Sequence, residues 1–332
     1  MAKLFLLEFT SPYHVGWRES LKIIESVTLH RALLYAAYEL LGDGGLADRL
    51  TKTRMSSVLP AIKTNGCYEV LVPVDHLPST VRLSKLGVEW APISAVGKLV
   101  AEVNKRCGGR AFVLVPGDGA LKVKCGGDFV LDLSVGEGLL TVGGGDHLRA
   151  GAFFELLEVW RNRVDRVTGA ADLFKATLVK PKTTLGVIVD SDQQQFEEVE
   201  KTLRLLGEVG IGGMRTTGAG KFIVREGRLC AGEDMLTGVS GPGFHVTLGA
   251  YLPSVTGDPV DRTRSAVRLV QLEGYAGTPL HTYILPKVVY AGAGSVLYFD
   301  KTPALPHVIK IGTGGQPAPA PVLVFNPVIV GG

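Results

Sequence analysis

The chain has 332 residues, of which 46% are hydrophobic and 20% are charged, a balance typical of folded proteins rather than disordered ones. Its length suffices for two domains, each with its own core. The formal net charge is only +3, so any contact with nucleic acid has to come from a local basic patch. No apolar run is long enough to cross a membrane, so we expect no membrane partner.

The four cysteines, Cys67, Cys107, Cys125 and Cys230, form no CxxC pair, and the N-terminus shows no signal-peptide pattern. We therefore expect reduced, mostly buried thiols in a cytoplasmic protein. A structural zinc, another metal or a cofactor is not expected.

Hydrophobic periodicity alternates between strand and helix patterns over the first 230 residues. Apolar residues at helical spacing predict helices from Ser26 or Thr28 to about residue 41, then over 92–106 and 192–206. Short apolar runs predict strands at residues 4–9, 67–72, 111–115, 129–133, 184–189 and from 222 onward. Residues 153–160 fit either a strand or a helix. The order matches a ferredoxin-like βαββαβ unit with inserts.

About 110 residues follow this unit, and Gly and Pro punctuate them throughout. Strand-like runs lie at residues 244–248, 266–270, 288–290, 295–299 and 322–325. We therefore predict an α+β protein with two ferredoxin-like (RRM-like) domains. The N-terminal domain, residues 1–230, is elaborated with inserts, and the C-terminal domain, residues 240–332, is mostly β.

The stretch between the helix at 192–206 and the strand from 222 is rich in glycine, with Gly210, Gly212, Gly213, Gly218 and Gly220 close together. Glycine permits positive φ and close backbone approach, so successive N–H groups can face an anion. Neighbouring Arg215, Thr216, Thr217 and Lys221 add charge and hydroxyl groups. The spacing fits neither a Walker A loop nor a dinucleotide fingerprint. The loop is therefore either a cradle for a polynucleotide backbone or a glycine-rich surface turn.

Three segments, in this order and spacing, resemble CRISPR-associated RAMP proteins. Residues 11–16, Ser-Pro-Tyr-His-Val-Gly, and the helix start at 24–33 resemble the opening of that superfamily, although Val27 replaces its usual acidic residue. Residues 162–174 resemble an Asn-x-Ile-Asp-Arg-x-Thr-Gly segment of RAMP backbone subunits, and residues 210–220 resemble the superfamily's glycine-rich loop.

The C-terminal half resembles one RAMP family in particular, subunit four of the type III-A Csm effector complex. The similar positions are residues 272–275, Lys287 and residues 291–296. This resemblance implies a non-catalytic scaffold that binds the 5′ repeat-derived tag of the guide RNA. Its implied protein partners are the large cyclase/nuclease subunit and the first RAMP backbone subunit. A hairpin thumb near residues 161–169 would also meet target RNA near the tag.

Two alternatives stay open. The chain resembles, less closely, a metal-independent RAMP endoribonuclease that would process guide RNA with His14 or His30. The other alternative is the equivalent subunit of a type III-B complex, whose usual N-terminal pattern is absent here.

Candidate RNA contacts come from four parts of the chain, and no catalytic residue is assigned. His14 fits an RNA contact or a turn stabiliser better than acid–base chemistry, and His30 fits the surface of a helix. Lys287 with the turn at residues 292–295 reads as a second backbone cradle or as a plain hairpin turn. The predicted RNA-binding residues are His14, Arg18, Arg161, Arg163, Arg166, Thr168, Gly212, Gly213, Arg215, Thr216, Thr217, Gly218, Gly220, Lys221 and Lys287. The acidic run at residues 190–200 is expected to cap and solvate its helix rather than bind metal.

Overall fold

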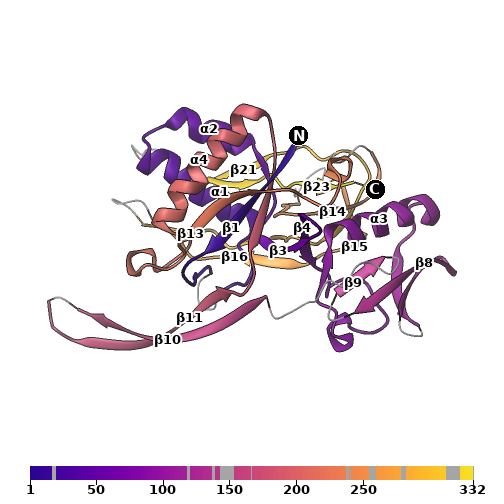
Figure 1. Cartoon of the computed structure of the whole chain (residues 1–332), viewed down its shortest axis with the longest axis horizontal. Coiled ribbons are helices and arrows are strands. Elements are labelled where there is room, and N and C mark those ends of the chain that lie inside the picture. Colours follow the sequence, from indigo (N-terminus) through magenta and orange to yellow (C-terminus); the bar gives the residue numbers. More distant parts are fainter. Residues whose placement is uncertain are drawn as a thin grey trace.

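The structure is a computed structural model, and it describes residues 1–16, 20–117, 120–136, 139–142, 153–165, 167–236, 239, 241–253, 259–277, 282–311 and 322–331. It is a mixed α/β protein with one large sheet and few helices, which agrees with the predicted class (Figure 1).

The first unit follows the predicted succession of strand, helix, two strands, helix and strand. Its elements are β1 (Ala2–Phe9), α1 (Ser26–Tyr35), β3 (Leu59–Thr64), β12 (Leu185–Asp190), α4 (Gln193–Val209) and β13 (Phe222–Gly227). In the sheet these strands lie in the order β13-β1-β12-β3, and β1 is antiparallel to both β12 and β13. The short strand β2 (Arg54–Met55) pairs with β12 outside that path.

Strand β1 is buried on both faces, so its sequence is a continuous apolar run instead of an alternating one. Leu4 and Leu6 belong to one hydrophobic cluster, whereas Phe5 and Leu7 belong to another that includes Leu29 of α1. Because successive strand residues point to opposite faces, this one strand supplies two separate cores.

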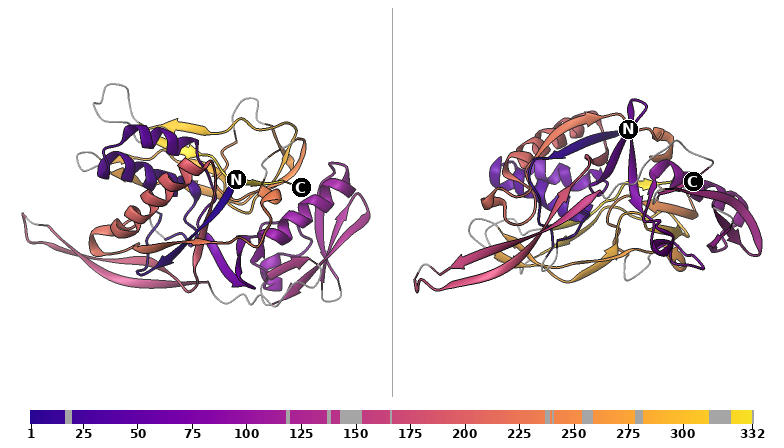
Figure 2. Two further views of the ribbon diagram at one scale, coloured as in Figure 1. Left: turned by 45° about the horizontal axis from the view of Figure 1, so that its top comes forward. Right: turned by 60° about the horizontal axis from the view of Figure 1, so that its bottom comes forward.

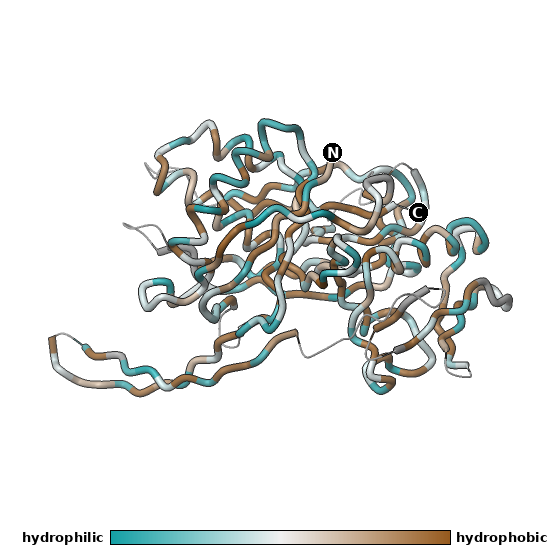
Figure 3. The backbone as a smooth tube through the Cα atoms, viewed as in Figure 1, coloured by the Kyte–Doolittle hydropathy of each residue, from teal (hydrophilic) through white to brown (hydrophobic). Residues whose placement is uncertain are grey.

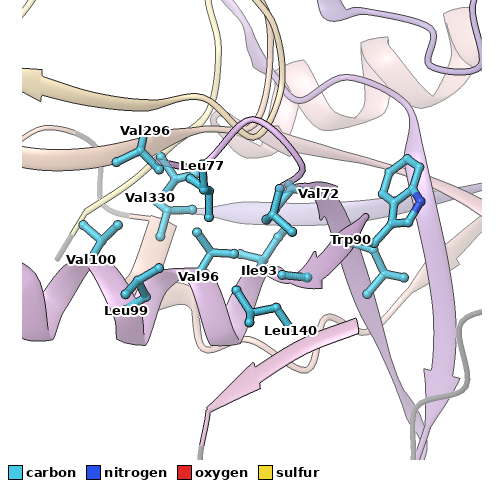
Figure 4. Close-up of a cluster of buried hydrophobic side chains, with 14 of the residues drawn as sticks. Val72, Leu77, Trp90, Ile93, Val96, Leu99, Val100, Leu140, Val296 and Val330 are labelled. Atoms are coloured by element: carbon cyan, nitrogen blue, oxygen red, sulfur yellow. The ribbon is translucent and has the colours of Figure 1, made fainter. Parts of the chain in front are cut away.

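A large insert between β3 and β12 extends the same sheet. It contains β4 (Cys67–Pro73), β5 (Trp90–Pro92), α3 (Ile93–Cys107), β6 (Phe112–Pro116), β7 (Ala120–Cys125), β8 (Asp128–Gly136) and β9 (Leu139–Val142). The sheet continues from β3 in the order β4-β5-β9-β8-β7-β6. The predicted stripe of α3, which includes Ile93, Val96 and Val100, is buried against Val72, Leu140 and their neighbours (Figure 4). The helix ends at Gly108, which takes the left-handed conformation with φ of 56°.

A long hairpin, β10 (Phe154–Val164) with β11 (Ala171–Pro181), completes the insert, so the ambiguous residues 153–160 form a strand. It is a separate two-stranded sheet that projects from the body in every view (Figures 1 and 2). Asp165 shapes its turn, because its Oδ1 accepts hydrogen bonds from the N–H groups of Val167 at 2.8 Å and Thr168 at 2.9 Å. Apolar and polar residues are interspersed along the projecting strands (Figure 3).

The C-terminal half is mostly β, as predicted. Its strands are β14 (Gly243–Thr247), β15 (Val260–Ala266), β16 (Leu269–Leu272), β17 (Tyr275–Gly277), β18 (Thr282–Ile284), β19 (Val288–Ala291), β20 (Val296–Phe299), β21 (His307–Lys310), β22 (Val322–Phe325) and β23 (Ile329–Val330). Four of them form a sheet in the order β15-β20-β14-β23. The strand expected over residues 266–270 is in fact the end of β15 and the start of β16.

The two halves share their interior. The largest hydrophobic cluster joins Leu4 and Leu71 of the first half to Phe244 and Val296 of the second. Val324 of β22 likewise packs in the cluster that contains helix α1. The two largest clusters therefore span both halves, because strands from the end of the chain return to helices of its beginning, whereas a smaller cluster around Tyr251 and Phe299 lies within the second half.

The segment after the first helix differs from the prediction. Helix α1 continues as a π-helical turn, Ala36–Leu40, and Leu40 is exposed. No helix was predicted between residue 41 and residue 92, but a second helix, α2 (Gly44–Lys52), begins among the glycines at residues 42–45. Its N-cap is Asp43, whose Oδ1 accepts a hydrogen bond from the Leu46 N–H at 2.8 Å. Short 3-10 turns complete the set at Leu83–Leu86 (η2), Arg215–Thr217 (η3) and Glu233–Leu236 (η4).

The cysteines are not free thiols, so that expectation was wrong. Cys67 is bonded to Cys230 and Cys107 to Cys125, with sequence separations of 163 and 18 residues. The first pair forms because Tyr68 at the start of β4 lies beside the chain after β13, where the Cys230 N–H donates to Tyr68 O at 3.0 Å. The spacing of the cysteines along the chain cannot predict such a contact, because it depends on the fold.

Candidate nucleic-acid interface

The predicted first turn lies between the projecting hairpin and the glycine-rich loop. Tyr13 and Val179 of β11 exchange backbone hydrogen bonds of 2.9 and 2.8 Å. On the other side, the N–H of Gly213 donates to His14 O at 2.7 Å. The His14 ring contacts the hairpin as well, with Nδ1 2.7 Å from the carbonyl oxygen of Thr177. Three segments far apart in the sequence therefore meet at His14.

The glycine-rich loop uses its backbone N–H groups for internal bonds. The N–H of Gly220 donates to Pro12 O at 2.8 Å, that of Lys221 to Ser11 Oγ at 2.9 Å, and that of Ile211 to Gly220 O at 3.0 Å. Within the loop, the N–H of Gly218 donates to Arg215 O at 2.9 Å. A cradle built from successive free N–H groups was one predicted option, and these bonds remove the N–H groups of Ile211, Gly218, Gly220 and Lys221 from it.

Three loop glycines, Gly210, Gly212 and Gly220, are required by close approach of neighbouring backbone, which is tightest at the last two. Gly212 has φ of 89°, and a Cβ there would lie 2.2 Å from His14 O. Gly220 has φ of 77°, and its Cβ would lie 2.1 Å from Ile211 O. Gly218 also has positive φ, at 84°, but no atom lies within 4 Å of its Cβ position. Close approach of backbone therefore explains why those three positions are glycine and fixes the shape of the loop.

Side chains from three elements converge on the η3 turn of the loop. The Arg215 guanidinium carbon lies 4.7 Å from the ring centroid of Tyr35 in α1, a cation–π contact. The Thr217 hydroxyl donates to Met214 O at 2.8 Å, and Nη2 of Arg161 in β10 lies 3.5 Å from Thr217 Oγ1. Thr216 and Lys221 are exposed beside them. The predicted residues of loop and hairpin are thus adjacent, and α1 joins them.

Other predicted RNA contacts lie elsewhere. Thr168 is exposed in the hairpin turn, and Arg163 stands opposite Asp172 in the strand register. Arg18 and Arg166 lie outside the described residues. No described contact joins Lys287 to the glycine loop; its Nζ is 3.9 Å from Glu273 Oε2.

The second predicted cradle, residues 292–295, is buried and does not face solvent. Gly294 has φ of 88°, and a Cβ there would lie 2.2 Å from Pro73 O. Nε of Arg268 donates to Ala293 O at 2.9 Å, and the Ser295 hydroxyl donates to Gly292 O at 2.7 Å. Of the two alternatives, the structure shows a packed turn.

His30 is buried, which corrects its expected place on a helix surface. Its Nδ1 lies 3.0 Å from Ser26 O and its Nε2 3.0 Å from Thr53 O. Burial lowers the pKa of this imidazole. With both nitrogens against carbonyl oxygens inside the protein, His30 cannot reach a bound substrate.

The acidic run behaves as predicted at the start of α4, where Asp192 Oδ1 accepts from the Gln195 N–H at 2.9 Å. Among the described residues, no group of three or more His, Cys, Asp or Glu side chains is placed to hold a metal ion. Within the same residues, no helix is both long and apolar enough to span a membrane.

Sequence reasoning missed Arg31 and Tyr35 of α1. Tyr35 supports Arg215 as described, and Arg31 lies one helical turn earlier with its Nη1 buried and without a hydrogen-bond partner. The hydrophobic pattern of α1 does not single out either residue. Only the folded protein shows that the glycine loop packs against the face of α1 that carries Tyr35.

No family model matches the chain, and no curated protein sequence matches it either. Among solved structures, a chain of the Csm3–Csm4 subcomplex in the type III-A CRISPR–Cas interference complex superposes with a TM-score of 0.55 at 14% identity. That alignment covers 99% of this chain and 98% of the other. The chain has the fold of a type III CRISPR RAMP subunit and resembles Csm4.

Two further structures score lower and add no argument. A Csm1–Csm4 cassette in complex with cA4 gives a TM-score of 0.48 at 12% identity over 100% of this chain and 98% of that chain. The type III-B Cmr-beta complex bound to cognate target RNA and AMPPnP gives 0.45 at 12% identity over 89% of this chain and 86% of that chain. At such identities, the similarity to the Csm3–Csm4 structure concerns the fold alone.

Proposed function

We propose that this protein is an RNA-binding subunit of a type III-A CRISPR effector complex that holds the 5′ tag of the guide RNA. Its protein partners in this proposal are the large cyclase/nuclease subunit and the first RAMP backbone subunit. The similar structure comes from a Csm3–Csm4 subcomplex of such a complex, which supports a place beside a backbone subunit. The two halves would correspond to two ferredoxin-like domains in a cytoplasmic ribonucleoprotein.

One observation carries the proposal: the first turn, the glycine loop and the hairpin meet. His14 contacts both Gly213 and Thr177, and Arg161 reaches Thr217. Cations from loop and hairpin thus border one stretch of surface, which suits an RNA backbone because phosphates are recognised mainly by basic side chains and hydroxyls. The projecting hairpin, with Trp160 and Leu173 exposed, suits a thumb that meets the guide–target duplex.

Guide occupancy of the assembled complex tests this proposal. The double variant Arg215→Gln/Lys221→Gln, co-expressed with the other subunits and a guide, should co-purify with less guide RNA per complex. A matched double variant, Arg82→Gln/Lys85→Gln, removes two exposed cations from the insert and should keep full occupancy. Undiminished guide in the first variant would show that the loop does not hold RNA.

The proposed subunit is a scaffold, not a nuclease. His30 is enclosed, and Nδ1 of His14 is engaged with Thr177 O, so His14 positions the turn between loop and hairpin. Purified protein incubated with repeat RNA in EDTA should therefore leave it intact. Cleavage that is lost in His14→Ala would instead establish the endoribonuclease alternative.

A further inference from the structure

Arg31 of α1 is a half-buried cation without a counter-ion among the described residues. Its Nη1 is buried and has no hydrogen-bond acceptor, and among the described residues Arg31 forms no ion pair. Burial, and to a lesser degree the positive charge of Arg215, lowers the pKa of its guanidinium to about 10. A buried N–H group of a cation that lacks an acceptor destabilises the free protein, so a ligand that accepts from it would stabilise the fold.

Arg215 lies over the same side of α1. Tyr35 follows Arg31 by four residues, which places the two side chains on one face of the helix. The Arg215 guanidinium covers the Tyr35 ring at 4.7 Å, and its charge acts on Arg31. The fold therefore brings two like charges together at the junction of helix and loop.

Arg161 adds a third guanidinium beside the η3 turn. Its Nη2 is 3.5 Å from Thr217 Oγ1, while its Nε is buried and has no acceptor in the described part of the chain. Two of these three arginines therefore carry a buried N–H donor without a partner. Guanidinium groups from separate elements, with donors left open, match the oxygens of a phosphate.

We propose that Arg31 and Arg215 clamp one phosphate of the bound RNA between α1 and the glycine loop, with Arg161 flanking it. The inference rests on the proposed RNA-binding function and deepens it, because it makes the first helix part of the interface. Binding of the phosphate relieves the repulsion between the two arginines. The site therefore increases the affinity for RNA, and when no phosphate is bound it lowers the stability of the protein.

Thermal unfolding of the full-length chain in sodium phosphate, against sodium chloride at equal ionic strength, tests the site directly. We expect phosphate to raise the Tm by about 2–4 °C once it exceeds its Kd several-fold. Arg31→Met should lose this rise, whereas the exposed control Arg82→Gln should retain it. In chloride, Arg31→Met should unfold at or above the wild-type Tm, because a flexible apolar chain replaces an unpaired half-buried cation.

The same variants are then titrated with a short single-stranded oligoribonucleotide. Arg31→Met should weaken binding about tenfold, the effect of losing a charge-assisted hydrogen bond. It should also reduce the slope of log K against log salt by about 0.7. Loss of the phosphate response with undiminished RNA binding would mean that the site takes free phosphate, and the RNA assignment would be overturned.

Two results would overturn the clamp itself: a retained phosphate response in Arg31→Met, or a Tm several degrees lower in chloride, as expected of a purely structural arginine. Guide occupancy of the complex separates this failure from failure of the proposed function. If the clamp is wrong but the function right, Arg215→Gln/Lys221→Gln loses guide and Arg31→Met does not. If the function is wrong, neither variant loses guide.

Discussion

Gly220, in the loop before β13, and Gly294, in the turn before β20, have nearly the same backbone environment. Their φ angles are 77° and 88°, and a Cβ would lie 2.1 Å from Ile211 O in one and 2.2 Å from Pro73 O in the other. For both glycine-rich turns, the sequence leaves two options open, a cradle for an RNA backbone or a plain turn. In each, glycine is needed because another stretch of main chain passes where a side chain would stand.

The surroundings of the two turns differ. The turn at residues 292–295 is buried, and it is bonded to Arg268 of the second half and to Glu25 of the first. The guanidinium of Arg268 beside this turn is bonded to the carboxylate of Glu25. The loop at residues 210–221 instead has Arg215 and Lys221 with no carboxylate bonded to either in the described chain. Glycine content therefore reports close packing of backbone, and only unpaired cations beside it point to a polyanion.

Glu25→Ala should have the largest effect, through the buried turn. Its Oε1 pairs with Arg268, and its Oε2 accepts from Ser57 Oγ at 2.7 Å and the Ala293 N–H at 3.4 Å. Removing one partner of a buried ion pair costs about 3–5 kcal/mol in the free energy of unfolding, measured by urea denaturation. Glu25→Gln, which keeps the acceptor, should lose less. A loss below about 1 kcal/mol for Glu25→Ala would show that this contact does not join the halves.

Gly220→Ala and Gly294→Ala should each destabilise the protein by about 2–4 kcal/mol, because the new methyl group meets a carbonyl oxygen and φ is positive. Gly218→Ala is the matched control for backbone strain alone and should cost about 1–2 kcal/mol. The guide RNA bound per complex is then measured at a temperature where both variants remain folded. Gly220→Ala should reduce the bound guide RNA, and Gly294→Ala should not. Equal guide loss in both would remove the distinction between them.

Removing a hydroxyl from each turn, that of Ser295 in the buried turn and that of Thr217 in the glycine loop, should have smaller effects on stability than the glycine substitutions. Ser295 Oγ is buried, donates to Gly292 O at 2.7 Å and accepts from the Arg268 N–H at 3.0 Å. Ser295→Ala leaves the backbone N–H of Arg268 without its acceptor and should lower the unfolding free energy by about 1–3 kcal/mol. Thr217 is exposed, so Thr217→Val should cost below about 1 kcal/mol. A reversed order of the two values in urea unfolding would contradict the burial assigned to these turns.

Lys287→Gln should have the smallest effect. Its exposed ammonium lies 3.9 Å from Glu273 Oε2, and such surface pairs contribute about 0–1 kcal/mol. Because that charge is partly offset, and no described contact ties it to the glycine loop, we also expect unchanged guide occupancy. A loss of guide comparable to that of Arg215→Gln would extend the interface into the second half and restore Lys287 as an RNA contact.

Much of the first unit could be predicted from the sequence, because its signals are local. The buried face of α3, the cap of α4 at Asp192 and the strand from Phe222 depend on residues a few positions apart. The motif resemblances marked the first turn, the glycine loop and the hairpin as RNA contacts, and the fold brings these three segments together. Helix α2 was missed because glycines at its start resembled a helix end, while the capping Asp43 among them went unrecognised.

The sequence by itself determined the alternation of strands and helices, the position of the glycine loop and the identity of the cations that border it. Only the tertiary structure decided which cations lack a partner, which glycine turn is buried, and which cysteines are bonded. Those outcomes depend on contacts between residues separated by tens to hundreds of positions, such as Glu25 with Arg268 and Cys67 with Cys230. Hydrophobic periodicity predicts which face of a helix or strand is buried, but it does not predict which residues pack against that face. For that reason Arg31 reads as an ordinary helix residue in the sequence and as an unpaired charge in the fold.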